Sequence, residues 1–420
     1  MTRSRFKLFA LLVSSFIFSQ NGTNSPYSFT GLGEVNFRGT QINRFMGGLE
    51  VYNDSIHANL SNPSSYSKLK LTNYSLGLNY RINNILGANE TKSMASSGLD
   101  YIGIALPTKF FGFGFGIIPF TSVGYKLSYL KSENESDEIL DLFKGQGGIN
   151  KVFFSLGFKA IKYLSFGVSL NYNFGRIMTE TGRFQDQLTL GTVLENKSSV
   201  SGLDFKFSSQ LEIPIKDNFQ LQAMFYFVPK ANLISTNSRF LNTRTYDSAT
   251  NFGEYIEIDL FDFGLNKTEI IIPSIVSFGI GIGEERKWFS GIQYTLNAMN
   301  DFSHEFASLP EVNYQNAYQF SLGGFYIPDY SSITSYWKRI VFRMGFRHEL
   351  TGVVINNFGL KESSINFGFG LPLAGFSNTN IGFEYGSRRG DNENMFKENF
   401  WSFRVGFSLN DKWFIKRKYN

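Results

Sequence analysis

The sequence feature that most restricts the fold is a strict alternation of apolar and small polar residues, repeated in long runs. In residues 164–175 every even position is Leu, Phe, Val or Tyr, and every odd position is Ser, Gly or Asn. Because successive side chains of a β-strand point to opposite faces, such a run has one apolar and one polar face. The runs reach about 10 residues, the length of a tilted strand that crosses a bilayer, whereas most soluble strands are shorter.

About fourteen such runs lie between residues 71 and 410, and the connections between them alternate in length. Short turns alternate with long polar connections, predicted at residues 82–96, 132–148, 177–197, 229–269 and 300–313. Outer-membrane barrels have an even strand number, short periplasmic turns and longer external loops. The sequence therefore predicts an all-β fold, a transmembrane antiparallel β-barrel of about 14 strands in the bacterial outer membrane, with lipid as a partner. A secreted β-sandwich is the alternative.

The two ends of the chain differ from the predicted barrel (residues 71–410). Residues 1–20 combine a basic start with an apolar stretch, which indicates a signal peptide. Residues 21–70 are rich in Gly, Asn and Ser and lack sustained alternation, which predicts a hatch that plugs the lumen rather than a disordered leader. The candidate hatch residues are Gly47, Gly48, Asn62 and Pro63. Residues 411–420 form a basic tail.

Composition excludes several classes of protein. The net charge is +5, and no basic tract indicates a nucleic-acid partner. The chain has no Cys and three scattered His, so we expect no disulfide, no metal site and no cofactor. No Ser–His or Asp–His set is apparent, so an enzyme is not expected. Beyond the N-terminus no apolar stretch is long enough for a spanning helix.

Pro119 interrupts one of the predicted strands. Proline has no N–H for a neighbouring strand, so it loosens the wall or kinks the strand. The alternation directs Phe115 and Ile117 to lipid, and Ile118 and Phe120 to the lumen. Apolar residues on the wet side, beside a break in pairing, predict a lateral exit at Ile118, Pro119 and Phe120. A plain bulge without a passage is the alternative.

Charged residues accumulate on the luminal face of the last strands. They are Arg343, Arg347, Glu384 and Arg404. Charged groups in a lumen usually pair with one another or with a plug. We therefore expect a charge network that holds the hatch, with a selectivity or gating role as the alternative.

Several stretches resemble the outer-membrane long-chain fatty-acid transporter family (FadL-like), in the version common in Bacteroidota. In the hatch region the resemblance lies in Ser25-Pro26-Tyr27-Ser28, Arg44-Phe45-Met46-Gly47-Gly48 and Asn62-Pro63-Ser64. Later it includes Gly368-Phe369-Gly370-Leu371-Pro372 and Ser408-Leu409-Asn410-Asp411. The resemblance implies a fourteen-strand barrel, a hatch that includes Arg44, and a kinked third strand with lateral exit.

Two functions therefore remain open. The first is passive uptake of fatty-acid-like hydrophobic small molecules through a hatch-gated lumen with lateral exit. The second is a non-transporting plug or docking subunit of a type IX secretion translocon, since the superfamily also includes such subunits. A continuous apolar tunnel would favour the first, and a sealed lumen would favour the second.

Overall fold

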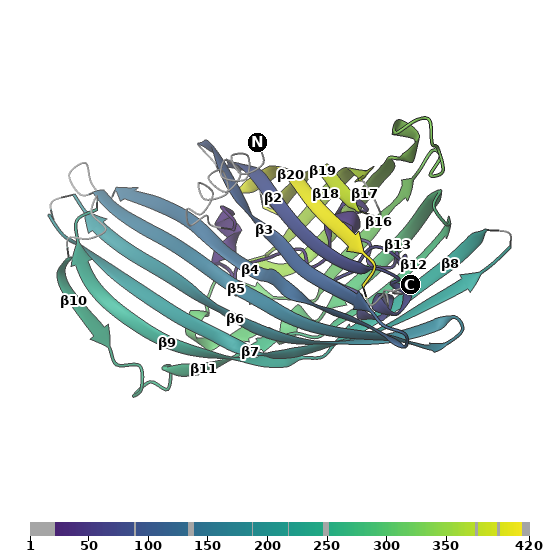
Figure 1. Cartoon of the computed structure of the whole chain (residues 1–420). Coiled ribbons are helices and arrows are strands. Elements are labelled where there is room, and N and C mark those ends of the chain that lie inside the picture. The colour runs from purple at the N-terminus through teal and green to yellow at the C-terminus, as the bar shows by residue number, and fades with distance from the viewer. Residues whose placement is uncertain are drawn as a thin grey trace, which may run out of the picture.

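The computed structural model describes residues 22–87, 90–132, 138–186, 188–216, 218–246, 252–373, 377–392 and 395–413. The predicted signal peptide and most of the basic tail therefore lie outside the described residues. Figure 1 shows a single sheet rolled into a barrel, with the purple N-terminal part inside it. No helix in the described part of the chain is long and apolar enough to cross a membrane.

The wall consists of antiparallel strands, and β2 pairs with β20 to close the ring. Two wall strands are each divided at a proline, β8 from β9 at Pro229 and β11 from β12 at Pro273. With each of these pairs counted as one, the described wall has 14 strands, which confirms the predicted number. The wall strands are β2 (Thr72–Leu86), β3 (Thr91–Pro107), β4 (Phe111–Ser132), β5 (Glu138–Ile161), β6 (Leu164–Gln185), β7 (Gly191–Pro214), β8 (Phe219–Val228), β9 (Ala231–Arg244), β11 (Lys267–Ile272), β12 (Ile275–Glu284), β13 (Trp288–Asn297), β16 (Ala317–Tyr326), β17 (Val341–Ile355), β18 (Phe358–Pro372), β19 (Asn378–Gly390) and β20 (Lys397–Asp411).

The remaining elements are short and lie inside the barrel or in its connections. Inside are η1 (Pro26–Phe29), β1 (Glu34–Val35), α2 (Gln41–Phe45) and η2 (Pro63–Lys68). In the connections are β10 (Phe252–Ile258), η3 (Met299–Asp301), β14 (Ser303–His304), η4 (Glu305–Ala307), β15 (Val312–Tyr314) and η5 (Trp337–Arg339).

The two faces of the wall follow the alternation of the sequence. Outward aromatic side chains such as Phe154, Phe383 and Trp401 are exposed, whereas inward polar ones such as Ser155 and Asn171 are buried. Hydrocarbon solvates an apolar outer face, and ring closure gives each strand a partner on both sides. The chain is therefore an outer-membrane barrel.

The wall is much taller on one side than on the other. Strands β4, β5, β6 and β7 have 22, 24, 22 and 24 residues, whereas β13 and β16 have 10 each. The difference is roughly 40 Å along the strand. The long strands extend at the end opposite to the short turns, to the left in Figure 1. We call this part the tall wall (β4–β7, β9 and β10).

The predicted long loops are wrong for much of their length, because the chain there continues as paired strands. Residues predicted as loops at 138–148 and 177–185 pair with each other as parts of β5 and β6. Ion pairs join neighbouring strands, as between Arg183 and Asp141 (2.7 Å). Above the membrane both faces of a strand meet water, so a polar sequence there does not distinguish a strand from a loop.

Residues 22–70, which we call the luminal segment, are largely buried within the barrel. Met46, Leu49 and Val51 form an apolar cluster with inward residues of β8, β12, β13 and β16. Tyr66 of η2 joins another cluster with inward residues of β3, β4 and β5. The luminal segment therefore makes the core that a barrel wall alone lacks.

Candidate functional site

The wall has a gap between β3 and β4. Pairing of these strands ends at Ile102 on β3 and Ile117 on β4. Above that point β3 stays paired with β2 and β4 with β5, so the facing edges separate. Pro119 lies two positions beyond the last pair, and a register shift there leaves Phe120 without a partner on β5. The pairing therefore stops beside the residue that lacks a backbone donor.

The luminal segment fills this gap from inside. Strand β1 runs antiparallel to β4 with Val35 opposite Thr121, and the following amide donates to the carbonyl of Phe120 (2.9 Å). On the other side of the gap the amide nitrogen of Asn24 donates to the carbonyl of Ala95 on β3 (2.6 Å). A piece of the luminal segment thus takes the place that β3 leaves beside β4.

The apolar side chains at the kink point inward. Ile118 and Phe120 are both buried. Ile118 belongs to the cluster around Tyr66, and Phe120 belongs to a cluster with Leu32 of the luminal segment. The three predicted exit residues therefore lie beside the gap, where the luminal segment covers them.

A cavity of about 270 Å³ adjoins β1 and Phe120. One side is apolar and aromatic, with Phe120, Tyr226 and Ile272 among its lining residues. Charged side chains lie directly beside these rings. The ammonium of Lys206 is 3.6 Å from the centre of the Tyr226 ring, and that of Lys151 is 4.5 Å from the centre of the Phe120 ring and pairs with a carboxylate of β7 at 2.6 Å. The cavity is thus amphipathic rather than purely apolar.

Arg44 on α2 anchors the luminal segment to the wall. Its guanidinium donates to both oxygens of Glu384 at 2.9 and 2.5 Å. Glu384 also contacts Arg404 (3.3 Å) and Arg347 (3.8 Å). Burial lowers the pKa of Arg44 to about 10, although the Glu384 carboxylate opposes this shift. The structure therefore brings together three of the four predicted luminal charges.

Arg343 stands apart from this network. Its guanidinium donates to the side chain of Asn380 (2.9 Å), and no ion pair joins it to Glu384 within the described residues. Arg343 is four residues nearer the short-turn end of β17 than Arg347, so it lies beside a different part of the luminal segment. The prediction of a single four-residue network is wrong in this respect.

A second ion-pair cluster, which the sequence did not indicate, surrounds Glu34 of β1. Its carboxylate accepts from Arg81 (2.8 Å) and Arg388 (2.6 Å). Arg388 also pairs with Glu362 (2.6 Å) and Glu398 (3.3 Å). Burial raises the pKa of Glu34, but the two cations outweigh burial and hold the pKa well below its usual range. Arg388 lies on the same face of β19 as Glu384, so the alternation of the sequence could have identified it as a luminal charge. No pattern in the sequence distinguishes Glu34.

The predicted hatch residues fit closely against the wall. Gly47 and Gly48 have φ of 72° and 85°, a conformation that favours glycine. Asn62 precedes Pro63 at the start of η2, and its side chain donates to Gln210 (2.7 Å). Each predicted hatch residue therefore contacts the wall or shapes the backbone that does.

Glycines of the wall make room for the luminal segment. A Cβ atom at Gly345 would collide with the backbone of Met46 and Gly47, and one at Gly368 or Gly382 would collide with the ring of Phe45. The sequence indicated bare backbone on the inner face. The structure adds that this bare backbone receives the luminal segment.

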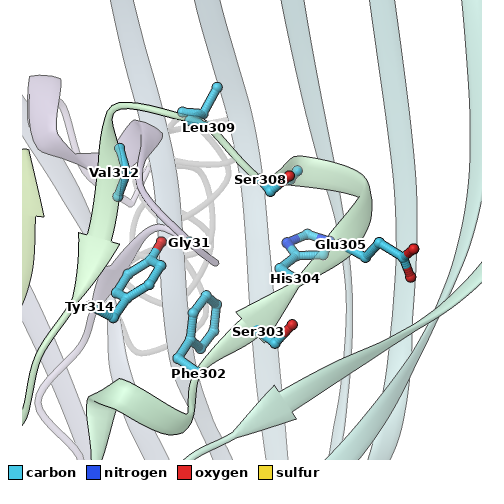
Figure 2. Close-up of a pocket in the computed structure, with 10 residues that line it drawn as sticks. Gly31, Phe302, Ser303, His304, Glu305, Ser308, Leu309, Val312 and Tyr314 are labelled. Atoms are coloured by element: carbon cyan, nitrogen blue, oxygen red, sulfur yellow. The ribbon is translucent and has the colours of Figure 1, made fainter.

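The connection between β13 and β16 holds the luminal segment at Gly31. Figure 2 shows Gly31 beside Tyr314 and Phe302, with His304 on the adjoining strand. An added Cβ at Gly31 would lie 3.2 Å from both the Phe302 ring and the Tyr314 hydroxyl. These residues line a cavity of about 160 Å³, where burial lowers the pKa of His304 to about 4. The sequence did not indicate this contact, which joins segments far apart along the chain.

Comparisons with known proteins agree on the barrel. A sequence model of a family described as BamG matches residues 1–420. No curated protein is significantly similar in sequence. Among solved structures, the chain is similar to the toluene transporter TbuX of Ralstonia pickettii, with 13% identity, 90% of this chain and 100% of that chain covered, and a TM-score of 0.56.

Two other solved structures are similar to the same degree. The toluene transporter TodX of Pseudomonas putida has 14% identity, with 90% of this chain and 99% of that chain covered and a TM-score of 0.56. A FadL homologue of Pseudomonas aeruginosa has 12% identity, with 90% and 98% covered and a TM-score of 0.53. At these identities the similarity shows a shared FadL-like fold. The resemblance to the Bacteroidota version stays a prediction.

Proposed function

The chain belongs to the BamG family, and from this premise and the geometry of the wall we propose that it is a barrel for passive uptake of hydrophobic small molecules. In this proposal the solute leaves the lumen sideways between β3 and β4. The observation that carries it is the gap between these strands, which the luminal segment fills at β1. The toluene transporters that share the fold support the class of solute.

In the proposed mechanism β1 is the moving part and the rest of the luminal segment stays in place. β1 is joined to β4 by few backbone hydrogen bonds, each with a net contribution of about 0.5–1.5 kcal/mol. Removing α2 would separate Arg44 from Glu384, and an unpaired buried charge costs about 3–5 kcal/mol. A local movement at the edge of the gap keeps the Arg44–Glu384 pair, and the contacts it must break are the hydrogen bonds to β4 and the ion pairs of Glu34.

Glu34 acts as the latch of β1 in this proposal. Its ion pairs with Arg81 and Arg388 are the strongest contacts of β1. When Glu34 leaves, Arg388 keeps two carboxylates, and the guanidinium of Arg81 stays 3.9 Å from the centre of the Phe400 ring. The wall residues thus keep other partners when Glu34 moves away. Solute that binds in the cavity beside β1 displaces β1 from the gap.

A disulfide across the gap tests the proposal. The chain has no Cys, so Val35→Cys with Thr121→Cys introduces the sole pair. These positions are opposite one another in the ladder, at a distance that suits a disulfide. We expect oxidised cells to lose most uptake of radiolabelled toluene and reduced cells to regain it, with each single-cysteine variant as a control. Equal uptake in both states would refute lateral exit at β1.

The role of Glu34 is tested by a substitution that should raise uptake, whereas the disulfide should lower it. Glu34→Gln removes the charge but keeps the size of the side chain, so β1 is held less firmly and we expect uptake to rise several-fold. Lys361→Gln, which removes one side of an exposed ion pair with Asp391, is the matched control and should leave uptake unchanged. Reduced uptake in Glu34→Gln would contradict the latch.

A docking subunit of a type IX secretion translocon is the second candidate. The observation that favours it is the dense packing of the lumen, where ion pairs and glycine contacts bind the luminal segment on several sides. Affinity purification in mild detergent separates the candidates. Retained apolar ligand supports uptake, whereas stoichiometric translocon protein with no toluene uptake supports docking.

A further inference from the structure

One connection at the short-turn end is much longer than its neighbours. Residues 327–340, which we call the rim loop, join β16 to β17, whereas residues 162–163 suffice between β5 and β6. Figure 1 shows the rim loop in green at the upper right, beyond the ends of the strands it connects. Two adjacent strands can be joined by far fewer residues, so the extra length of the rim loop requires another explanation.

The rim loop presents an apolar tip. Ile333 is 96% exposed and Trp337 is 75% exposed, and both exceed the roughly 40–50% typical of outward side chains in the wall. Tyr330 and Tyr336 are also exposed. A tip of this composition is unfavourable in water and favourable at an apolar boundary.

Hydrogen bonds within the rim loop fix this shape. The amide of Asp329 donates to the carbonyl of Lys338 (2.8 Å) across the neck of the loop. The carboxylate of Asp329 accepts from the amide (3.1 Å) and hydroxyl (2.9 Å) of Ser331. These hydrogen bonds order the rim loop, from which the side chains of Ile333 and Trp337 are exposed.

The rim loop contacts the end of the neighbouring strand β18. The hydroxyl of Tyr336 donates to the carbonyl of Pro372, at the end of β18 (3.1 Å). Just above, the outward rings of Phe342 and Phe369 pack at 5.8 Å between centres as part of the lipid-facing surface. The rim loop therefore lies next to the lipid-facing surface of β17 and β18.

Cations accompany the apolar tip. Lys338 and Arg339 follow Trp337 directly, and Arg286 of a neighbouring turn lies 5.1 Å from the ring centre of Tyr330. Asp329 is the sole acidic residue of the rim loop, and Ser331 occupies its carboxylate. Aromatic, aliphatic and cationic side chains grouped together are typical of segments that bind a lipid interface.

We propose that the rim loop is a membrane anchor that binds anionic phospholipid in the periplasmic leaflet. Ile333 and Trp337 enter the boundary between headgroups and acyl chains, while Lys338 and Arg339 contact the phosphates. The continuity with the lipid-facing wall and the positive charge favour a lipid surface over a soluble protein as the occupant. This inference is independent of whether the lumen transports a solute.

The absence of Cys permits a direct test with the whole protein. Ile333→Cys, labelled with an environment-sensitive fluorophore, is reconstituted in vesicles of phosphatidylcholine with rising phosphatidylglycerol. We expect a blue shift, quenching by lipid-attached spin labels and protection from a water-soluble quencher. Glu285→Cys, in the short turn between β12 and β13, is the matched control and should stay accessible to the water-soluble quencher.

Charge is tested separately. Adding Lys338→Gln and Arg339→Gln to the labelled variant should weaken the preference for phosphatidylglycerol by about fivefold for each cation removed. Water exposure at Ile333→Cys equal to that at Glu285→Cys in every vesicle would overturn the proposal. Shielding that occurs only after periplasmic protein is added would overturn it too, in favour of a protein partner.

Discussion

Arg44 is the side chain on which the attachment of the luminal segment depends most. It lies in the interior with both oxygens of Glu384 as acceptors, and Glu384 has no exposed surface. Arg404 and Arg347 alone leave that carboxylate with longer contacts, at 3.3 and 3.8 Å. This bidentate contact is one of several that attach the luminal segment, and a point substitution can remove it.

Arg44→Ala should lower the free energy of unfolding by about 3 kcal/mol, since it leaves Glu384 buried with its weaker partners. Urea unfolding in lipid vesicles measures the change. Lys361→Ala breaks the exposed pair with Asp391 and should cost at most about 1 kcal/mol. Similar losses in the two variants would show that burial does not distinguish the pairs.

Glycine at position 345 matters for the space it leaves. An alanine there would push against the backbone at Met46 and Gly47, and overpacking of this kind costs about 1–3 kcal/mol. We expect Gly345→Ala to make the luminal segment sensitive to protease in the folded barrel. Gly359→Ala is the control, because its nearest atom, an Asp391 oxygen, would be 3.6 Å away. If the luminal segment of Gly345→Ala resists the protease as well as that of the unchanged protein, the backbone at Met46 and Gly47 can shift to make room for the added methyl group.

At the scale of the element, β4 determines where the ring can open. Its lower part pairs with β3, its middle part with β1, and the whole strand with β5. Pro119 separates the first two partners. One residue type thus divides a strand into a part of the wall and a part that holds the luminal segment.

Pro119→Val restores a backbone donor beyond the last pair of β3 and β4. Extended pairing would draw β3 into the place of β1, so we expect toluene uptake to fall at least several-fold. Pro372→Val, at the short-turn end of β18, should leave uptake unchanged. Unchanged uptake in Pro119→Val would show that the proline does not cause the gap, and that another feature, such as the register shift at Phe120, does.

The spanning parts of the strands could be predicted because lipid and lumen impose opposite polarity on alternate residues. The upper parts of β5 and β6 could not, since both of their faces meet water and the alternation fades. In the site, Pro119 could be identified because proline lacks a backbone N–H in any surroundings. Glu384 and Arg404 could be identified because the alternation places them on the inner face of their strands. Glu34 could not, because it lies on a two-residue strand whose partner is distant in sequence.

At the scale of the whole molecule, the unequal height of the wall sets the position of the membrane. The lipid-facing aromatics occupy the part that all strands share, and the tall wall rises beyond it. Outward residues on the two parts of one sheet therefore have different solvents, although their exposed fractions are similar.

Phe154→Arg and Leu130→Arg test this division. Both side chains are at least half exposed, Phe154 in the shared part and Leu130 on the tall wall. Leu130 lies on the face of β4 opposite to Val123 and Tyr125, which pack inward. A charge at the centre of the lipid-facing surface costs about 2–4 kcal/mol, so Phe154→Arg should lower stability by that amount. Leu130→Arg should change it by less than about 0.5 kcal/mol. Equal losses would place the tall wall within the membrane.

The seam at which the ring closes joins the first wall strand to leave the ribosome with the last. On the β3 side of that seam the hydroxyl of Tyr101 accepts from the amide of Gln41 (3.1 Å), and on β20 the carboxylate of Glu398 accepts from Ser25 (2.7 Å). The N-terminal part of the described chain thus contacts wall strands from both ends of the sequence. Closure of the circumference and these two contacts of the interior are therefore coupled, because a barrel without β20 loses the seam with β2 and the acceptor of Ser25 together.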